Sequence, residues 1–158
     1  MAASNSAWVE KSTSDKGGSM IAIDPPAIIR EHEGLRLEAY RCSEGKLTIG
    51  YGHRIQANEP RRITKAQAMA MFKVDYSNAE ANARQVLPSY DYQPPGVQCV
   101  VVSMCFQLGK AGTSKFRNTL ANLNMRRYGA ASSHMRQSIW YRQTPNRVEA
   151  LIALLPKG

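Results

Sequence analysis

Three residues in the first third of the chain have side chains that could act together in catalysis. They are Glu33, Cys42 and Thr48, with eight residues between the first two and five between the last two. A glutamic acid can donate a proton, a thiolate can act as a base or a nucleophile, and a threonine hydroxyl can hold a water molecule. The chemistry requires that all three side chains reach one cleft.

Local sequence signals place Glu33 at the end of a helix. Asp24 can cap a helix that begins with Pro25 and Pro26, and both prolines suit its first turn. Gly34 directly follows Glu33 and is a typical helix stop. The carboxyl group is therefore expected at the C-terminal end of this helix.

A β-hairpin is predicted directly after that helix. Residues 35–40 alternate between apolar and polar side chains, which is the period of a half-buried strand. The Ser43-Glu44-Gly45 sequence predicts a turn, and residues 46–53 predict the returning strand. A third strand or loop is expected to continue to about Pro60. Such a hairpin could bring Cys42 and Thr48 to the same cleft as Glu33.

The remainder of the chain reads as helical. Thr64 and Gln67 form a capping box at the start of a long helix that ends before Pro88. A second helix, from Pro94 to Gly109, is apolar nearly all round and should be buried. Shorter helices are expected around residues 116–123 and 130–138, and a last one after Thr144-Pro145.

These elements predict an α+β fold that is predominantly helical. We expect a small β lobe (33–63), a connecting helix (64–87) and a larger helical lobe (88–158), which together form one domain over 23–158. Residues 1–22 are rich in Ser, Ala, Gly and Lys and predict a flexible tail or linker.

The net charge of the chain indicates what kind of partner the protein binds. The net charge is +9 and the sequence pI is about 9.7, which favours a polyanionic partner such as nucleic acid, a membrane surface or an acidic cell-wall polymer. The basic residues are scattered and do not form the run that is typical of a nucleic-acid arm.

Other classes of chemistry have no support in the sequence. The three cysteines are odd in number, and Cys99 and Cys105 lie in an apolar run as expected core residues. There is no metal-ligand spacing, no apolar stretch long enough to span a membrane, and no signal-peptide pattern. We expect no cofactor and no metal.

Four motifs together resemble one enzyme family. The segments Glu33–Leu37 and Thr48–His53, with the Glu, Cys and Thr spacing, resemble the catalytic stretch of the phage-type lysozymes. Residues 106–109, 116–120 and 140–147 are similar to later motifs of that family, in the same order. The resemblance covers about residues 24–155.

The resemblance implies both the reaction and the site. The reaction would be hydrolysis of the β-1,4 bond between N-acetylmuramic acid and N-acetylglucosamine in peptidoglycan. Glu33 would be the general acid, for which it must be protonated near neutral pH, and Thr48 would position the attacking water. Cys42 would replace an aspartate, as base, stabiliser or nucleophile.

Further site residues follow from the same resemblance. Substrate-binding positions would be Phe106, Gln107, Thr119 and His134, the last standing where the family has an asparagine. The site would be supported by Arg147 near Glu33, by Tyr40, and by His53 in a buried ion pair with Asp75.

The expected partner is bacterial peptidoglycan, bound by a monomer, with no nucleic acid and no stable membrane insertion. The enzyme would pass from the host cytoplasm to the periplasm and cell wall, or would be carried by the virion. The alternatives are a lytic transglycosylase, a catalytically impaired wall-binding relative, and a basic helical module that binds nucleic acid.

Overall fold

The computed structural model describes residues 22–157, so the predicted tail at 1–22 lies outside the described residues except for Ala22. The chain divides into two compact units. The β unit contains residues 26–78, and the helical unit contains residues 79–157 together with residues 22–25.

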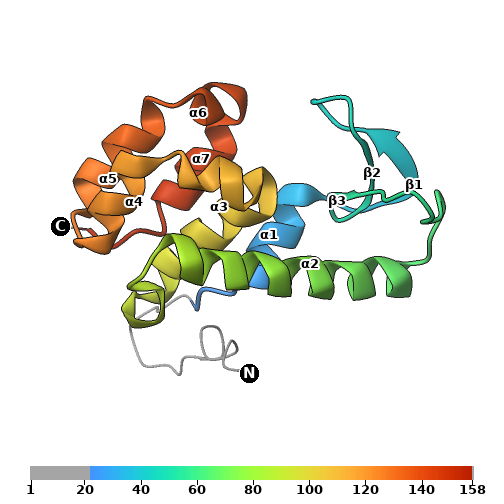
Figure 1. Ribbon diagram of the computed structural model, residues 1–158, viewed down its shortest axis with the longest axis horizontal. Coiled ribbons are helices and arrows are strands. Elements are labelled where there is room, and N and C mark those ends of the chain that lie inside the picture. Colours follow the sequence, from blue (N-terminus) through green and yellow to red (C-terminus); the bar gives the residue numbers. More distant parts are fainter. Residues whose placement is uncertain (1–21, 158) are drawn as a thin grey trace. The chain divides into compact units, whose positions relative to one another are not determined.

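The fold is α+β and predominantly helical, as predicted (Figure 1). The elements in chain order are α1 (Pro25–Glu33), β1 (Arg36–Arg41), β2 (Leu47–Gly50), β3 (His53–Arg54), α2 (Lys65–Val86), the 3-10 helix η2 (Tyr90–Tyr92), α3 (Pro95–Ser114), α4 (Arg117–Asn124), α5 (Tyr128–Arg136), α6 (Ile139–Gln143) and α7 (Pro145–Ile152).

The three strands form one antiparallel sheet in the order β1-β2-β3. The single returning strand predicted over 46–53 is wrong, because the chain turns after Gly50 and begins β3 at His53. Gly50 and Gly52 have φ angles of 68° and 74°, a left-handed conformation that glycine adopts without strain. This turn makes β2 the central strand.

The β unit has a small apolar core. Ile49 of β2, Ile63 of the following loop and Ala68 of α2 are fully or almost fully buried, with exposures of 0%, 5% and 0%. These contacts fix the sheet against the first half of α2. The sheet is therefore a firm support for the residues on β1 and β2.

The long helix α2 begins as the sequence predicts. The backbone N–H of Thr64 donates to Oε1 of Gln67 at 2.8 Å, and the N–H of Gln67 donates to Oγ1 of Thr64 at 3.1 Å. This reciprocal pair is the predicted capping box. The boundary between the two units falls within α2, after Asn78.

The helical unit is built around α3. Residues 96–105 of this helix are all buried, which confirms the predicted central helix and the core positions of Cys99 and Cys105. Burial raises the pKa of these two thiols to about 12 and about 11. The helical backbone is broken at Gly109 (φ 77°), as predicted, but helical turns resume and continue to Ser114.

Two short elements were not predicted, η2 and α6. Neither is long enough to show a hydrophobic period. Ser138 caps α6, because its Oγ accepts from the N–H of Tyr141 at 3.0 Å. Among residues 22–157, no helix is long and apolar enough to cross a membrane.

Candidate active site

Glu33 ends α1 and lies against the turn between β2 and β3. Its side chain is half-buried. A Cβ atom added to Gly52 would overlap Oε1 of Glu33, so the carboxyl group packs directly on the glycine backbone. The sequence showed the glycine but not this close approach, which joins two segments nearly twenty residues apart.

Cys42 follows β1 at the start of the hairpin turn. Its N–H donates to the carbonyl of Lys46 at 2.9 Å, and its carbonyl accepts from the N–H of Gly45 at 2.8 Å. Burial raises the pKa of the Cys42 thiol, but hydrogen bonds with the Glu44 and Lys46 backbone and with Thr48, together with the positive charge of Arg54, outweigh burial and lower this pKa. Cys42 therefore ionises at a lower pH than a free cysteine.

Thr48 lies on the central strand and is 3% exposed. Its hydroxyl donates to the carbonyl of Lys46 at 2.8 Å and is also within hydrogen-bonding reach of the Cys42 thiol. In the sheet register it lies opposite Tyr40 on one side and Arg54 on the other. The strand therefore presents a fixed hydroxyl beside the sulfur.

Tyr40 connects the electrostatics of Glu33 and Cys42. Burial and the negative charges of Glu33 and Cys42 raise the pKa of the Tyr40 hydroxyl, against the opposing charge of Arg36. The Arg36 guanidinium lies over the Tyr40 ring, 4.3 Å from its centroid. Tyr40 therefore lies close enough to both predicted catalytic groups to feel their charges, and its supporting role stays a prediction.

His53 is held between two carboxylates. Its Nδ1 lies 2.7 Å from Oδ2 of Asp75, the expected contact, and its Nε2 lies 2.8 Å from Oε1 of Glu59. Burial lowers the pKa of the imidazole, but its hydrogen bonds to Asp75 and Glu59 outweigh burial and raise it. No sequence pattern points to Glu59, because this residue lies in a loop without periodicity.

The predicted substrate-binding residues all lie in the helical unit. Phe106 and Gln107 are half-buried on α3, Thr119 is 2% exposed on α4, and His134 is half-buried on α5. Arg147 is half-buried on α7. Their binding and supporting roles stay predictions.

Trp140 is a core residue, which accords with the preference that large aromatics have for the interior. It is 4% exposed, its Nε1 donates to Oε1 of Gln107 at 2.9 Å, and its ring meets that of Phe116 edge-on at 5.6 Å. Gln107 is therefore oriented by Trp140 through its amide oxygen, which leaves the amide nitrogen as a donor for another group.

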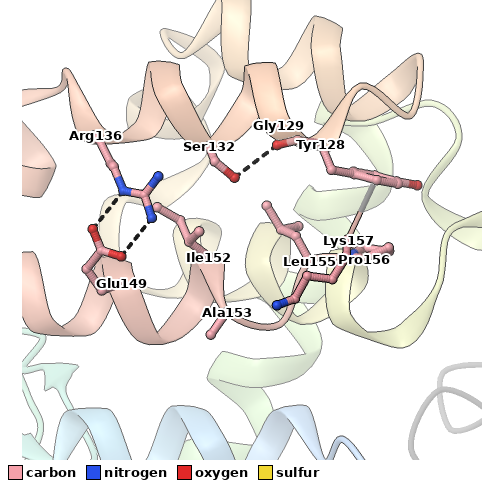
Figure 2. A pocket seen from close by; sticks show the side chains of 10 residues that line it. All are labelled: Tyr128, Gly129, Ser132, Arg136, Glu149, Ile152, Ala153, Leu155, Pro156 and Lys157. Carbon is pink, nitrogen blue, oxygen red and sulfur yellow. Dashed lines mark hydrogen bonds and ion pairs between the residues drawn. The ribbon is translucent and has the colours of Figure 1, made fainter.

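A pocket of about 500 Å³ lies in the helical unit between α5 on one side and α7 with the segment after it on the other (Figure 2). At one end, Arg136 binds Glu149 through two hydrogen bonds of 2.7 and 2.9 Å, and Ile152 and Leu155 form apolar walls. The hydrogen bonds from Arg136 and Tyr141 lower the pKa of Glu149 to about 2, so the pair stays charged and mutually neutralised. The pocket contains none of the predicted site residues.

Sequence comparisons identify the family. The Phage lysozyme family profile matches residues 30–153, which is most of the chain and includes every predicted site residue. The chain belongs to the phage lysozyme family. As a member of this family, the protein is a peptidoglycan hydrolase. Within residues 22–157, no group of His, Cys, Asp or Glu side chains could hold a metal ion.

Three relatives illustrate the range of proteins that carry this domain. Probable T4-type lysozyme 2 of Dictyostelium discoideum is 24% identical, over 83% of this chain and 92% of the relative. An endolysin of Acyrthosiphon pisum secondary endosymbiont phage 1 is 32% identical, over 67% of this chain and 70% of the relative. The pre-baseplate central spike protein Gp5 of Enterobacteria phage T4 is 28% identical, over 83% of this chain but 27% of the relative.

Proposed function

We propose that this protein is a muramidase that hydrolyses the β-1,4 bond between N-acetylmuramic acid and N-acetylglucosamine in peptidoglycan. The observation that carries the proposal is the arrangement of Glu33, Cys42 and Thr48 in one small unit inside the family match. The residues provide a carboxyl group, a thiol whose pKa is lowered, and a fixed hydroxyl.

The chemistry divides between these three groups. Glu33 donates its proton to the glycosidic oxygen as the bond to the anomeric carbon breaks. A water molecule held by the Thr48 hydroxyl attacks that carbon and passes a proton to the Cys42 thiolate, or the thiolate stabilises the cationic centre while solvent takes the proton. Direct attack by sulfur would instead give a covalent intermediate and retain the anomeric configuration.

A direct test uses Glu33→Gln with Glu31→Gln as its matched control, because Glu31 is exposed on the same helix. Purified peptidoglycan sacculi are incubated with each protein, and soluble fragments and new reducing ends are measured. We expect Glu33→Gln to lose at least about 100-fold in rate, since general acid catalysis contributes that much, and Glu31→Gln to keep its activity.

The products distinguish this proposal from its alternatives. Mass spectrometry should find fragments that end in reducing N-acetylmuramic acid. Anhydro-muramic ends would identify a lytic transglycosylase, and no release by the wild type would identify an impaired wall-binding relative. NMR of the first anomer formed separates inversion from retention.

We propose that the enzyme acts at the bacterial cell wall in the service of a bacteriophage, as a monomer. The relatives support two settings, because one is an endolysin and another is a central spike protein. Host lysis and wall penetration during infection need the same reaction.

A further inference from the structure

The helical unit carries an exposed surface that the proposed reaction does not use. Tyr92, at the end of η2, is 79% exposed, and Met125, directly after α4, is 53% exposed. Arg126 and Arg127 follow Met125 and are both exposed. We call Tyr92, Met125, Arg126 and Arg127 the basic turn.

Two hydrogen bonds hold the basic turn together. Oδ1 of Asn124 accepts from the backbone N–H of Ser89 at 3.1 Å, which ties the end of α4 to the start of η2. Nη2 of Arg126 donates to the carbonyl of Tyr92 at 2.8 Å. These contacts place a guanidinium group beside an exposed aromatic residue, although 34 positions separate them in the chain.

The backbone at Arg126 is in a conformation that favours glycine. Its φ is 62°, the one positive value among the non-glycine residues that the structure describes. The N–H of Arg126 donates to the carbonyl of Leu123 and that of Arg127 to the carbonyl of Asn122, which is the Schellman ending of a helix. An arginine here carries strain that a glycine would avoid, and such strain is a reason to look for a role of the side chain.

The charge of the basic turn is not neutralised by neighbours. Asp91 in the same 3-10 helix pairs with Arg84 at 2.9 Å, and Oε2 of Glu80 accepts from the Tyr90 hydroxyl at 3.1 Å. No ion pair between described residues involves Arg126 or Arg127. Both arginines are exposed, and the contact of the Arg126 guanidinium with the Tyr92 carbonyl leaves its positive charge unneutralised.

We propose that the basic turn is an accessory binding site for peptidoglycan, separate from the reacting bond, which holds the enzyme on the wall between cleavage events. Arg126 and Arg127 bind carboxylates of the stem peptides, and the Tyr92 ring stacks on a sugar face. The identity of the polymer rests on the proposed function. A membrane surface is disfavoured because interfacial binding needs a broad apolar face, and this surface offers two apolar side chains.

The test measures binding without cleavage. In the Glu33→Gln background, cosedimentation with purified sacculi gives an apparent Kd for the parent and for Arg126→Gly, Arg126→Lys and Tyr92→Ala. Lys73→Gln is the charge-matched control, because Lys73 is exposed on α2 and outside the basic turn. We expect Arg126→Gly to raise the Kd about 3-fold, the usual scale for one exposed charged contact, and Arg126→Lys and Lys73→Gln to leave it within error.

The Arg126→Gly variant should fold normally, because glycine is the preferred residue at this helix-end position. We therefore expect its Tm to be unchanged or higher than that of the parent. If Lys73→Gln weakens binding to sacculi as much as Arg126→Gly does, general charge attraction explains the binding and the proposal is overturned. If Arg126→Gly leaves the Kd unchanged, the basic turn has no role in binding and the proposal is overturned as well. An Arg126 effect on anionic phospholipid vesicles but not on sacculi would overturn it in favour of a membrane. If the wild type fails to cleave sacculi but binding still depends on Arg126, the proposed muramidase activity is rejected and the accessory binding site is supported.

Discussion

At the scale of single residues, the site depends on how the backbone surrounds the predicted catalytic groups. The sulfur of Cys42 lies in a hairpin turn that directs backbone N–H groups and the Thr48 hydroxyl toward it. A thiol in water would be mostly neutral at pH 7, since its usual pKa is about 8.5. The turn therefore makes the thiol of Cys42 more acidic than that of a free cysteine.

Replacement of Cys42 tests this interpretation. We expect Cys42→Asp to remain active and Cys42→Ala to lose most of its activity, because only the first keeps an anionic group. Iodoacetamide should inactivate the wild type, with a rate that rises at a lower pH than for a free cysteine, because the pKa of Cys42 is lowered. Full activity after complete alkylation would show that the sulfur is a spectator.

Gly52 positions Glu33, and an added methyl group should show this. Gly52→Ala places a Cβ on the carboxyl group of Glu33 and also strains a backbone with φ 74°. Gly45→Ala is the matched control, because Gly45 has φ 78° and open space around it. Both changes should cost about 1–2 kcal/mol of stability.

The activity measurement separates the two glycine variants. We expect Gly52→Ala alone to lose about 10- to 100-fold in the rate of sacculus cleavage, since small displacements of a catalytic group have effects of this size. Equal activity of the two variants would mean that Glu33 tolerates displacement.

At the scale of elements, the imidazole of His53 links three segments of the β unit. The residue lies at the start of β3, Glu59 lies in the loop that follows, and Asp75 lies on α2. The Glu59 carboxylate also accepts from the N–H of Gln56 at 2.7 Å, so the loop closes on itself. A charged imidazole satisfies both carboxylates at once.

The pH dependence of stability should reveal this link. Because the folded pKa of His53 is raised, its stabilising effect is complete below pH about 6.5 and is lost as the pH rises through the folded value. The hydrogen bonds with Gln56 and His53 lower the pKa of Glu59. The stability that the Glu59 carboxylate contributes is therefore lost as the pH falls through the lowered pKa of Glu59 in the folded protein.

The variant Glu59→Gln gives the measurement. It should lose about 1 kcal/mol near pH 6 and much less above the folded pKa of His53, as judged by thermal melts across that range. Glu38→Gln, which breaks an exposed pair with Arg62, should change little and show no dependence on pH in the same window. A loss that is constant from pH 6 to pH 10 would contradict a charged His53.

At the scale of the whole molecule, the two units differ in the size of their cores. The helical unit buries residues 96–105 of α3 among its other helices, whereas the β unit has a cluster around Ile49, Ile63 and Ala68. A smaller core gives a lower free energy of local opening. The predicted catalytic groups Glu33, Cys42 and Thr48 thus lie in the unit with less apolar burial.

Amide hydrogen exchange should show that the β unit opens more readily than the helical unit. We expect amides of α3 over residues 97–105 to exchange at least about tenfold more slowly than those of β1 and β2. A difference of about 1.4 kcal/mol in the free energy of local opening is enough to cause a tenfold difference in exchange rate. Deuterium uptake measured by mass spectrometry near neutral pH would show this. Identical protection in both regions would mean that the chain opens as one cooperative unit.

The sequence by itself determined the family, the longer helices and the places of Glu33, Cys42 and Thr48 along the chain's elements. These depend on local signals: a capping box at Thr64 and Gln67, proline and glycine at helix ends, and a fixed spacing of residue types. Such signals act over a few residues, and the structure confirms the elements that they predict.

Tertiary structure decided what surrounds those residues. The break of the predicted strand at Gly50, the contact of Gly52 with Glu33 and the second carboxylate on His53 each join segments that have no local relation. The strained Arg126 beside Tyr92 is of the same kind. Periodicity and residue type report which side chains are available, but only the folded chain decides which of them meet, because contact depends on the packing of distant segments.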